Sequence, residues 1–475
     1  MAVESDLSSE PAEDGRAISM PHELVRFIQR ETYSLLIKGY AGTGKTTLAL
    51  TVLRALGSRD SFFYISTQVS PKQLFQYYPW LNRFIEQSPK SLGAEGDGSH
   101  HVMVPTFEDA RLDEPESLFE KITNQLMDIK SPVIIIDSWD AIASFMDREA
   151  RLNNERVLQT WRERAGAKLI FISEHPDDTT LDFLVDGILE LKQSLYDNVR
   201  VREIFLRKLR GVRIDKPSYI FTLENGVFRS FAPYSLLEWH AKLRAASPRS
   251  KAELFGSRHV SSGYKMLDDA LRGGFPKKGI VLLELDPHVS TSVAMAFLGG
   301  LAINFISNGH PVLFQPFDWI DPRAIMDYVE PLPRGKKNLF KILWTRKVTG
   351  MRNNVIVQSQ THSPSLAPVA NLKKKYPTKV LLNIMGTDVI QQSNAGKGFM
   401  SMMTELMLGA RAGDLSIAVL SGSQKEMLEY FSEVSDIHVR LLLINDTLFL
   451  QPLVPASTLY AIEFSTDHIN LEPVV

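Results

Sequence analysis

The sequence predicts an α/β protein with two tandem domains, each built on a mostly parallel central sheet that ends in antiparallel hairpins. Three observations support this fold class. Apolar strand-like runs alternate with helix-like segments, the same order of signals recurs about 245 residues later, and each copy ends in strand-like segments. A chain of 475 residues is also long for a single core, since domains commonly hold about 100 to 200 residues.

These signals divide the chain into four parts. Residues 1–17 are acidic and polar without the apolar core of a signal peptide, and we expect a disordered tail there. We expect the first domain at 18–237 and the second at 257–475. The polar stretch 238–256 between them is predicted to be the linker.

Composition excludes several classes of protein. With 44% hydrophobic and 23% charged residues the chain resembles an ordinary globular protein, and no apolar run approaches the roughly 20 residues that cross a bilayer. The absence of cysteine excludes disulfides and thiolate metal sites and suits a cytoplasmic location. A net charge of −2 argues against broad DNA binding as the main task, although a local basic patch stays open.

The strongest motif is GYAGTGKT, Gly39 to Thr46, with the apolar strand SLLIK before it and an apolar-periodic helix after it. Glycines let backbone amides converge on a phosphate at the amino end of a helix. Lys45 supplies a cation for the phosphates, and Thr46 supplies a hydroxyl for Mg²⁺. The predicted nucleotide-binding residues are Gly39, Tyr40, Ala41, Gly42, Thr43, Gly44, Lys45, Thr46 and Thr47.

An acidic partner for the magnesium follows a second apolar run. Asp137 stands at the carboxyl end of VIIID, a continuous apolar stretch typical of a central parallel strand. A carboxylate there can bind the hydrated metal, so Thr46 and Asp137 are the predicted magnesium ligands.

The phosphate loop, VIIIDS and a late RKLRG resemble the RecA-type ATPases, and among them the clock protein KaiC and its archaeal relatives. The resemblance covers nearly all of residues 17–235. It implies a RecA-like three-layer domain that binds ATP with Mg²⁺, and a homo-oligomer such as a hexameric ring. No membrane association is implied.

The same resemblance assigns a role to Lys208 and Arg210. They match a Lys-x-Arg that reaches the γ-phosphate of the neighbouring subunit in that family. Residues two apart on a strand face the same side, so both can meet one phosphate. The alternative for this stretch is a solvated basic strand.

One position departs from the family. Relatives carry a glutamate after the second strand to orient the attacking water, whereas this chain has Thr67 and Gln68 there. We therefore expect slow hydrolysis or a substitute base. Gln68 can orient a water, and Glu174 is a candidate contact to the nucleotide, or else a cap for the next turn.

The second half carries the same lead-in, SSGYKMLDDALRGGFPKKG, but its loop reads LELDPHVSTS. Leu285, His288 and Ser290 replace the glycines, and we expect their three side chains to occupy the phosphate's space. Thr291 replaces the lysine, and Asp286 adds negative charge. Met385 replaces the metal-binding aspartate, while Pro452 and Val454 replace the basic pair. These changes predict a pseudo-ATPase domain kept for packing or for contact with a protein partner.

The favoured prediction is a weakly hydrolysing, KaiC-like regulatory ATPase whose nucleotide state, ATP or ADP, controls assembly or partner binding. A second resemblance, to the archaeal GvpD gas-vesicle regulators, implies transcriptional or signalling control in an archaeon. Two alternatives stay open. One is a RadA-like recombinase paralogue that binds DNA, and the other is a non-catalytic scaffold stabilised by ATP.

Overall fold

The structure is a computed structural model that divides into two compact units. It describes residues 19–57, 62–86, 106–111, 115–126, 129, 131–146, 157–158, 160–234, 258–315, 325–326, 332, 334–344, 354–357, 367–386, 404, 407–408, 410–412, 414–464 and 469–475. The first unit comprises Met1–Ala232 with Val474–Val475, and the second comprises Pro233–Pro473. The predicted tail at 1–17 and linker at 238–256 lie outside the described residues.

The described strands of the first unit form one sheet in the order β3-β2-β4-β5-β1-β6-β7-β8-β9. Their bounds are β1 Tyr33–Lys38, β2 Phe62–Ser66, β3 Thr106–Asp109, β4 Val133–Asp137, β5 Lys168–Ser173, β6 Gly187–Tyr196, β7 Val199–Leu209, β8 Ser218–Thr222 and β9 Arg229–Ser230. The six strands from β3 across to β6 in this sheet order pair in parallel. The pairs β6–β7, β7–β8 and β8–β9 are antiparallel, as the hairpin signals predicted.

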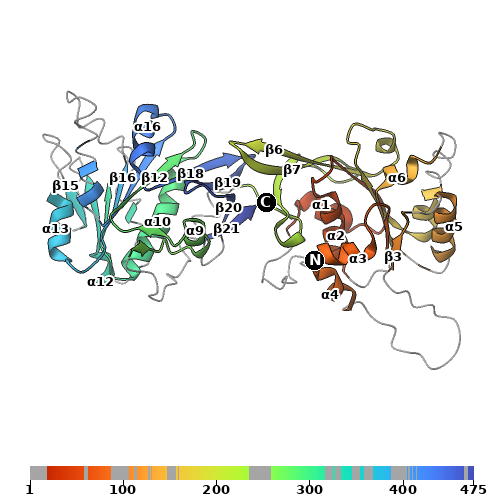
Figure 1. Ribbon diagram of the computed structural model, residues 1–475, viewed down its shortest axis with the longest axis horizontal. Helices are drawn as coiled ribbons and strands as arrows, with labels where there is room; N and C mark the ends of the chain where they lie inside the picture. The colour runs from red at the N-terminus through yellow and green to blue at the C-terminus, as the bar shows by residue number, and fades with distance from the viewer. Residues whose placement is uncertain are drawn as a thin grey trace. The chain divides into compact units, whose positions relative to one another are not determined.

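Helices cover both faces of this sheet (Figure 1). One face packs against α1 (His22–Ile28), α2 (Lys45–Leu56), α3 (Pro71–Tyr77) and α4 (Trp80–Glu86). The other packs against α5 (Pro115–Leu126), α6 (Trp139–Ala143) and the short 3₁₀ turn η1 (Leu181–Phe183). Strand β1 is buried along its whole length and β4 at all but its last residue, because each lies in the middle of the sheet under helices on either side.

The second unit repeats this plan in the order β15-β14-β13-β16-β17-β12-β18-β19-β20-β21. Its strands are β12 Gly279–Leu285, β13 Val312–Gln315, β14 Phe340–Trp344, β15 Val355–Val357, β16 Leu382–Gly386, β17 Leu415–Ser421, β18 Ile437–Ile444, β19 Thr447–Val454, β20 Leu459–Phe464 and β21 Ile469–Val474. Strand β12 lies between β17 and β18 just as β1 lies between β5 and β6. The two units are therefore tandem RecA-like sheets with antiparallel strands at their carboxyl ends.

Helices of the second unit also lie on both faces of its sheet. On one face are α9 (Lys265–Ala270) and α10 (Thr291–Ser307), beside the short α12 (Arg334–Lys337). On the other are α13 (Ala367–Lys375) and α16 (Lys425–Val434). A small ribbon of β10 (His259–Val260) and β11 (Phe275–Pro276) precedes β12. None of the helices that the structure describes is long and apolar enough to cross a membrane.

Candidate nucleotide site

The predicted phosphate loop connects the carboxyl end of β1 to α2 at the centre of the first sheet. The residue before α2, Gly44, has φ +100°, a left-handed conformation that favours glycine. A Cβ there would lie 2.6 Å from a methyl carbon of Leu223. At Gly39 a Cβ would approach the carbonyl oxygen of Leu191 to 2.5 Å, so neither position accepts a side chain.

The outer side of the loop is open. Gly42 has φ +79°, and a Cβ built on it meets no atom within 4 Å. Inside the loop, the Thr43 hydroxyl donates to the Tyr40 carbonyl over 2.8 Å and fixes the turn. The loop is thus packed against neighbouring residues at Gly39 and Gly44 and open at Gly42.

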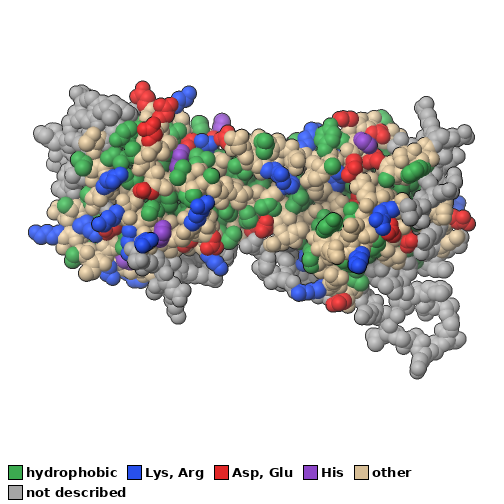
Figure 2. Space-filling model, in the orientation of Figure 1, with side chains coloured by type: hydrophobic (Ala, Val, Ile, Leu, Met, Phe, Trp, Pro, Cys, Tyr) green, Lys and Arg blue, Asp and Glu red, His purple; other side chains and the backbone are tan. Residues whose placement is uncertain are grey.

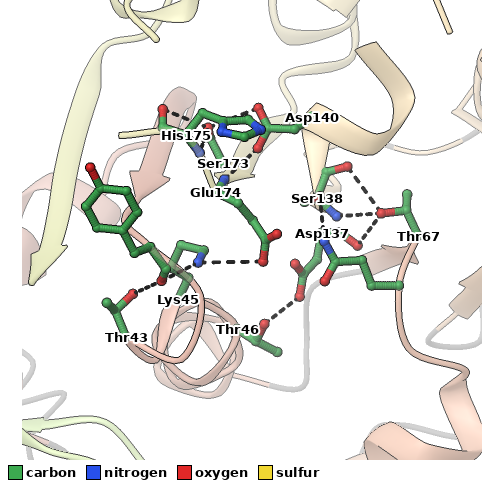
Figure 3. Close-up of polar contacts among 12 residues, drawn as sticks. Thr43, Lys45, Thr46, Thr67, Asp137, Ser138, Asp140, Ser173, Glu174 and His175 are labelled. Carbon is green, nitrogen blue, oxygen red and sulfur yellow. Dashed lines mark hydrogen bonds and ion pairs between the residues drawn. The ribbon is translucent and has the colours of Figure 1, made fainter. Parts of the chain in front are cut away.

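Lys45 lies beneath this loop with its ammonium group close to the backbone (Figure 3). The Nζ donates to the Tyr40 carbonyl over 2.9 Å and lies 3.9 Å from Oε1 of Glu174. Only 6% of the Lys45 side chain is exposed, and this burial lowers its pKa, while nearby carboxylates act in the opposite direction. An ammonium group held with so little hydration is poised to bind an anion.

Thr46 and Asp137 come together as the sequence predicted. The Thr46 hydroxyl donates to Oδ2 of Asp137 over 2.7 Å, and the Tyr64 hydroxyl donates to the same oxygen over 2.5 Å. Burial raises the pKa of Asp137, although both hydroxyl donors counteract it. A buried carboxylate next to a hydroxyl fits Mg²⁺, which is bound by one or two carboxylates together with phosphate and water.

The metal would need the nucleotide as a further ligand. No group of three His, Cys, Asp or Glu side chains that could hold a metal occurs within the described part of the chain. Thr46 and Asp137 are therefore an incomplete site by themselves, as in P-loop proteins where phosphate oxygens complete the coordination.

Glu174 is the carboxylate nearest to Lys45, and the structure shows how it is held. Its backbone N–H donates to Oδ2 of Asp140 over 2.5 Å, and the Ser173 hydroxyl donates to the other oxygen of Asp140 over 3.1 Å. Figure 3 shows Glu174 reaching towards Lys45 from the end of β5. The sequence pointed to Glu174 but not to Asp140 or Tyr64, because Tyr64 reads as an ordinary strand residue.

The two residues after β2 are placed differently from a catalytic glutamate. Thr67 accepts from the N–H of Ser138 over 2.7 Å and donates to the carbonyl of Asp137 over 3.1 Å, so it holds the end of β4. Gln68 is exposed, and its amide donates to the Ser138 hydroxyl over 3.2 Å. Both residues therefore touch the backbone or hydroxyl next to Asp137.

Among the other predicted loop residues, Thr47 and Tyr40 have side-chain partners outside the loop. The Thr47 hydroxyl lies 2.9 Å from the Tyr78 hydroxyl, and the Tyr40 hydroxyl donates to Asp177 over 3.1 Å. Tyr40 is nevertheless 63% exposed, while Ala41 is exposed on the outside of the turn. These side chains thus link the loop to neighbouring elements, and Lys45 contacts the Tyr40 carbonyl within the loop.

Lys208 and Arg210 lie towards the amino ends of the parallel strands β1 and β6, whereas the phosphate loop lies at their carboxyl ends. Leu209 pairs with Gly187 at the start of β6, whereas the loop follows the carboxyl end of β1. Lys208 donates to the Asp182 carbonyl over 2.9 Å, and Arg210 pairs with Asp186 over 2.9 Å. The structure therefore does not bring this pair to the phosphate loop of its own chain.

Asp186 also ties Arg210 into the fold of its own unit. Its Oδ2 accepts from Arg162 over 2.7 Å and from the Ser34 hydroxyl over 3.0 Å. Arg210 remains 60% exposed despite its contact with Asp186. The Arg210 guanidinium group thus forms an ion pair with Asp186 of its own unit and is also accessible at the surface.

The equivalent loop of the second unit, residues 286–290, has a different backbone. None of these residues is left-handed, and Ser290, the residue before α10, has φ −67° and ψ 146°. Asp286 accepts a hydrogen bond from the N–H of His288 over 3.0 Å, so one amide of the loop already donates to a carboxylate of the chain itself. An anion at this helix terminus would meet that negative charge.

One prediction about this loop was wrong. The Leu285 side chain does not enter the space of a phosphate, because β12 continues to Leu285 and its side chain packs in the core, 4% exposed. His288 and Ser290 are exposed. Met385 is buried near the end of β16. Pro452 and Val454 lie on β19, so no cationic side chain stands at the positions that correspond to Lys208 and Arg210.

Comparison with known proteins agrees with this geometry. Residues 24–210 match the family described as GvpD gas vesicle protein, P-loop domain. The chain is 28% identical over 331 residues to Protein GvpD2 of Halobacterium salinarum, a match that covers 66% of this chain and 65% of the relative. It is 28% identical to Protein GvpD1 of the same organism over 333 residues, which is 66% of this chain and 59% of the relative.

A second group of relatives is the clock proteins. The circadian clock oscillator protein KaiC of Thermostichus vulcanus is 25% identical over 262 residues, 52% of this chain and 47% of that protein. The chain thus spans less than two thirds of the length of the GvpD proteins and about half of KaiC. Together with the loop, Asp137 and the strand order, these matches show that residues 24–210 contain a P-loop domain like that of the GvpD proteins, and that the chain is similar to GvpD and KaiC proteins with RecA-like sheets.

Proposed function

We propose that the first unit binds Mg-ATP and hydrolyses it slowly, and that its nucleotide state controls assembly or partner binding. The observation that carries this proposal is the loop geometry, in which a glycine turn that accepts no side chain surrounds the buried Lys45 beside the Thr46–Asp137 pair. We assign this role to a domain at 18–237 and a pseudo-ATPase role, presenting a partner surface, to a domain at 257–475.

Each residue of the site has a separate task in this proposal. The loop amides and Lys45 bind the phosphates, while Thr46 and Asp137 hold the magnesium. Bound Mg²⁺ would neutralise charge on the β- and γ-phosphates. Asp137 is kept in place by Thr46 and by Tyr64, whose hydroxyl donates to the same carboxylate oxygen.

Slow turnover follows from the missing glutamate after β2. A positioned base contributes about 10²- to 10⁴-fold to rate, and Gln68 cannot accept a proton at neutral pH. Glu174 is the substitute that the geometry favours, because its carboxylate lies 3.9 Å from the Lys45 ammonium and its backbone is fixed by Asp140.

Comparison of two variants tests which residue acts. Glu174→Gln should abolish most of the remaining turnover while ATP affinity stays within a few-fold of wild type, and Gln68→Ala should reduce turnover less. ATP hydrolysis in single turnover, with affinity measured separately, separates the two. Unchanged turnover in Glu174→Gln would remove Glu174 from the chemistry.

Assembly is the second part of the proposal. Lys208 and Arg210 lie at the sheet edge opposite their own phosphate loop, so they can contact a nucleotide only in a neighbouring copy. Light scattering should show that wild type forms a larger particle with Mg-ATP than without it. The particle size of Lys45→Ala should be the same in both conditions. Identical sizes in all conditions would contradict nucleotide-controlled assembly.

Mixing two inactive variants tests action between subunits directly. Lys45→Ala lacks a working site but keeps the basic pair, and Lys208→Ala with Arg210→Ala keeps the site but lacks the pair. Mixed oligomers should regain part of the turnover only if the pair acts on a neighbour. Arg207→Ala is the matched control, because Arg207 lies next to Lys208 on β7, pairs with Glu190 of β6 and is 47% exposed.

A further inference from the structure

The nearly neutral charge of the chain conceals a segregated basic segment. Residues 334–387, a stretch of 54, contain 11 Lys and Arg but no Asp or Glu. At the chain's average of 55 acidic residues in 475, about six would be expected there. Since the whole chain carries −2, the other 421 residues carry −2 − 11 = −13.

The fold places the described parts of this segment at one end of the second sheet. Strands β15 and β14 are its outermost strands on that side, α13 covers one face of them and α12 lies next to α10. We call this region the basic edge, and its described lysines are Lys336, Lys337, Lys341, Lys373, Lys374, Lys375 and Lys379. Figure 1 shows α12, α13 and β15 together at this end of the unit, and Figure 2 shows Lys and Arg side chains on it.

Nearby lysines contribute to the lowered pKa values of two groups at the basic edge. Burial lowers the pKa of Lys341, and the charge of nearby Lys375 lowers it further. Burial lowers the pKa of His310 to about 4, and Lys379 is the next largest cause in the same direction. Of the lysines at the edge, Lys373 contacts Asp414.

A stretch of chain with charges of one sign only is unusual for a purely solvated face, although Asp414 from outside the stretch pairs with Lys373. Soluble proteins intersperse both signs, because like charges close together destabilise the compact state. A polyanion that supplies many negative groups at once relieves this repulsion, and nucleic-acid phosphates do so at close and regular spacing.

The packing of α13 argues against a membrane surface. Val369 and Leu372, the apolar residues of its middle, are 5% and 6% exposed and pack on Leu313 and Leu343 of the sheet. They are therefore not available for insertion between lipids, as an interfacial helix would require. The exposed lysines Lys374 and Lys375 follow directly at the end of the helix.

We propose that the basic edge of the second unit binds the phosphate backbone of nucleic acid without reading its sequence. This inference goes beyond the ATP site and does not depend on it. It also differs from the RadA-like alternative, because it places the contacts on the second unit and implies no recombination.

The test uses the full chain and fluorescence anisotropy of a short labelled DNA duplex and, in a second arm, a single-stranded RNA. The test variant is Lys374→Ala with Lys375→Ala. The matched control is Lys265→Ala with Lys425→Ala, two exposed lysines elsewhere in the same unit with the same change in net charge. Affinity is measured from about 50 to 200 mM salt, where each phosphate contact contributes about 0.9 to the slope for a duplex.

The proposal expects salt-dependent binding by wild type and by the control, and at least a several-fold weaker affinity with a slope smaller by about two for the test variant. RNA bound more tightly than DNA would assign the edge to RNA within the same proposal. Absence of binding at low salt, an equal loss in both double variants, or tighter binding to polyglutamate or to anionic vesicles would overturn it. Lys45→Ala should bind nucleic acid like wild type, so failure of the ATP proposal is recognised separately.

Discussion

The two equivalent loops of this chain follow equivalent strands, β1 and β12, and lead into equivalent helices, α2 and α10, but only the first has left-handed glycines and a buried lysine. The first ends in Gly44 with φ +100°, and the second ends in Ser290 with φ −67°. In the first, Lys45 is buried beside the backbone, whereas in the second, Asp286 caps an amide. The two sheets therefore share a strand order, while the loops at equivalent positions differ in backbone conformation and charge.

Replacing the loop lysine should give the largest difference between the two units. Lys45→Ala is expected to weaken ATP binding about 10- to 100-fold, since a hydrogen bond to a charged group is worth roughly 1.5 to 3 kcal/mol, and to abolish turnover. Thr291→Ala, at the equivalent position, should change neither. Titration calorimetry checks both, and equal effects of the two variants would break the comparison.

The left-handed glycine should give the next largest effect. Gly44→Ala forces a Cβ to within 2.6 Å of Leu223 at a positive φ, and left-handed backbone costs an L-residue about 1 to 2 kcal/mol before the clash is counted. We expect lower thermal stability and weaker ATP binding.

The control is Ser290→Ala in the other loop. Ser290 makes no capping hydrogen bond through its side chain, so a loss below about 0.5 kcal/mol is expected. Differential scanning calorimetry measures both variants. A large loss in Ser290→Ala would show that the second helix depends on its serine after all.

Asp137 should give a pH-dependent effect without a counterpart in the second unit. Burial raises its folded-state pKa above the ordinary 3.8, so its contribution to stability is present at pH values below that number and is lost as pH rises through the folded pKa. Without nucleotide or metal, Asp137→Asn should therefore become stabilising relative to wild type as pH rises.

Mg-ATP should reverse that order, because asparagine offers the metal no negative charge. Melting temperatures over a pH series, with EDTA or with Mg-ATP, check the sign of each change. Met385→Leu, the matched variant on β16, should have a melting temperature that depends on pH in the same way as that of wild type. A pH profile of Asp137→Asn parallel to that of wild type would contradict the buried carboxylate as its source.

Apart from the control variants, the smallest effect is expected at Asp286. Asp286→Ala removes one side-chain acceptor for the His288 N–H, which is worth about 0.5 to 1.5 kcal/mol. ATP binding to the second unit should not appear, because neither a lysine nor a metal-binding acid is restored. Nucleotide bound to the second unit of this variant would show that Asp286 alone prevents binding.

Much of the site could be predicted from the sequence because its signals are local. A glycine pattern between a strand and a helix specifies the loop, and an acid at the end of an apolar strand specifies Asp137. The contact between Thr46 and Asp137 then follows from parallel strands that end at the same edge. The position of Leu285 was predicted wrongly, because strand β12 runs one residue further when glycine is absent.

The remaining contacts join positions far apart in the chain. Tyr64 donates to Asp137 from another strand, Asp140 fixes the backbone of Glu174, and Arg210 pairs with Asp186. Such contacts depend on strand order and side-chain direction, which have no signature in a single sequence.

The sequence by itself determined the two repeated α/β sheets, the glycine- and lysine-bearing loop of the first and the absence of those residues from the equivalent loop of the second, because glycine, lysine and apolar periodicity act over a few residues. Only the tertiary structure decided that Glu174 lies next to Lys45, that the basic pair is at the sheet edge opposite its own loop, and that an acid-free stretch gathers at one end of the second sheet. Those arrangements depend on which strands lie side by side, and that is settled by packing of the whole sheet.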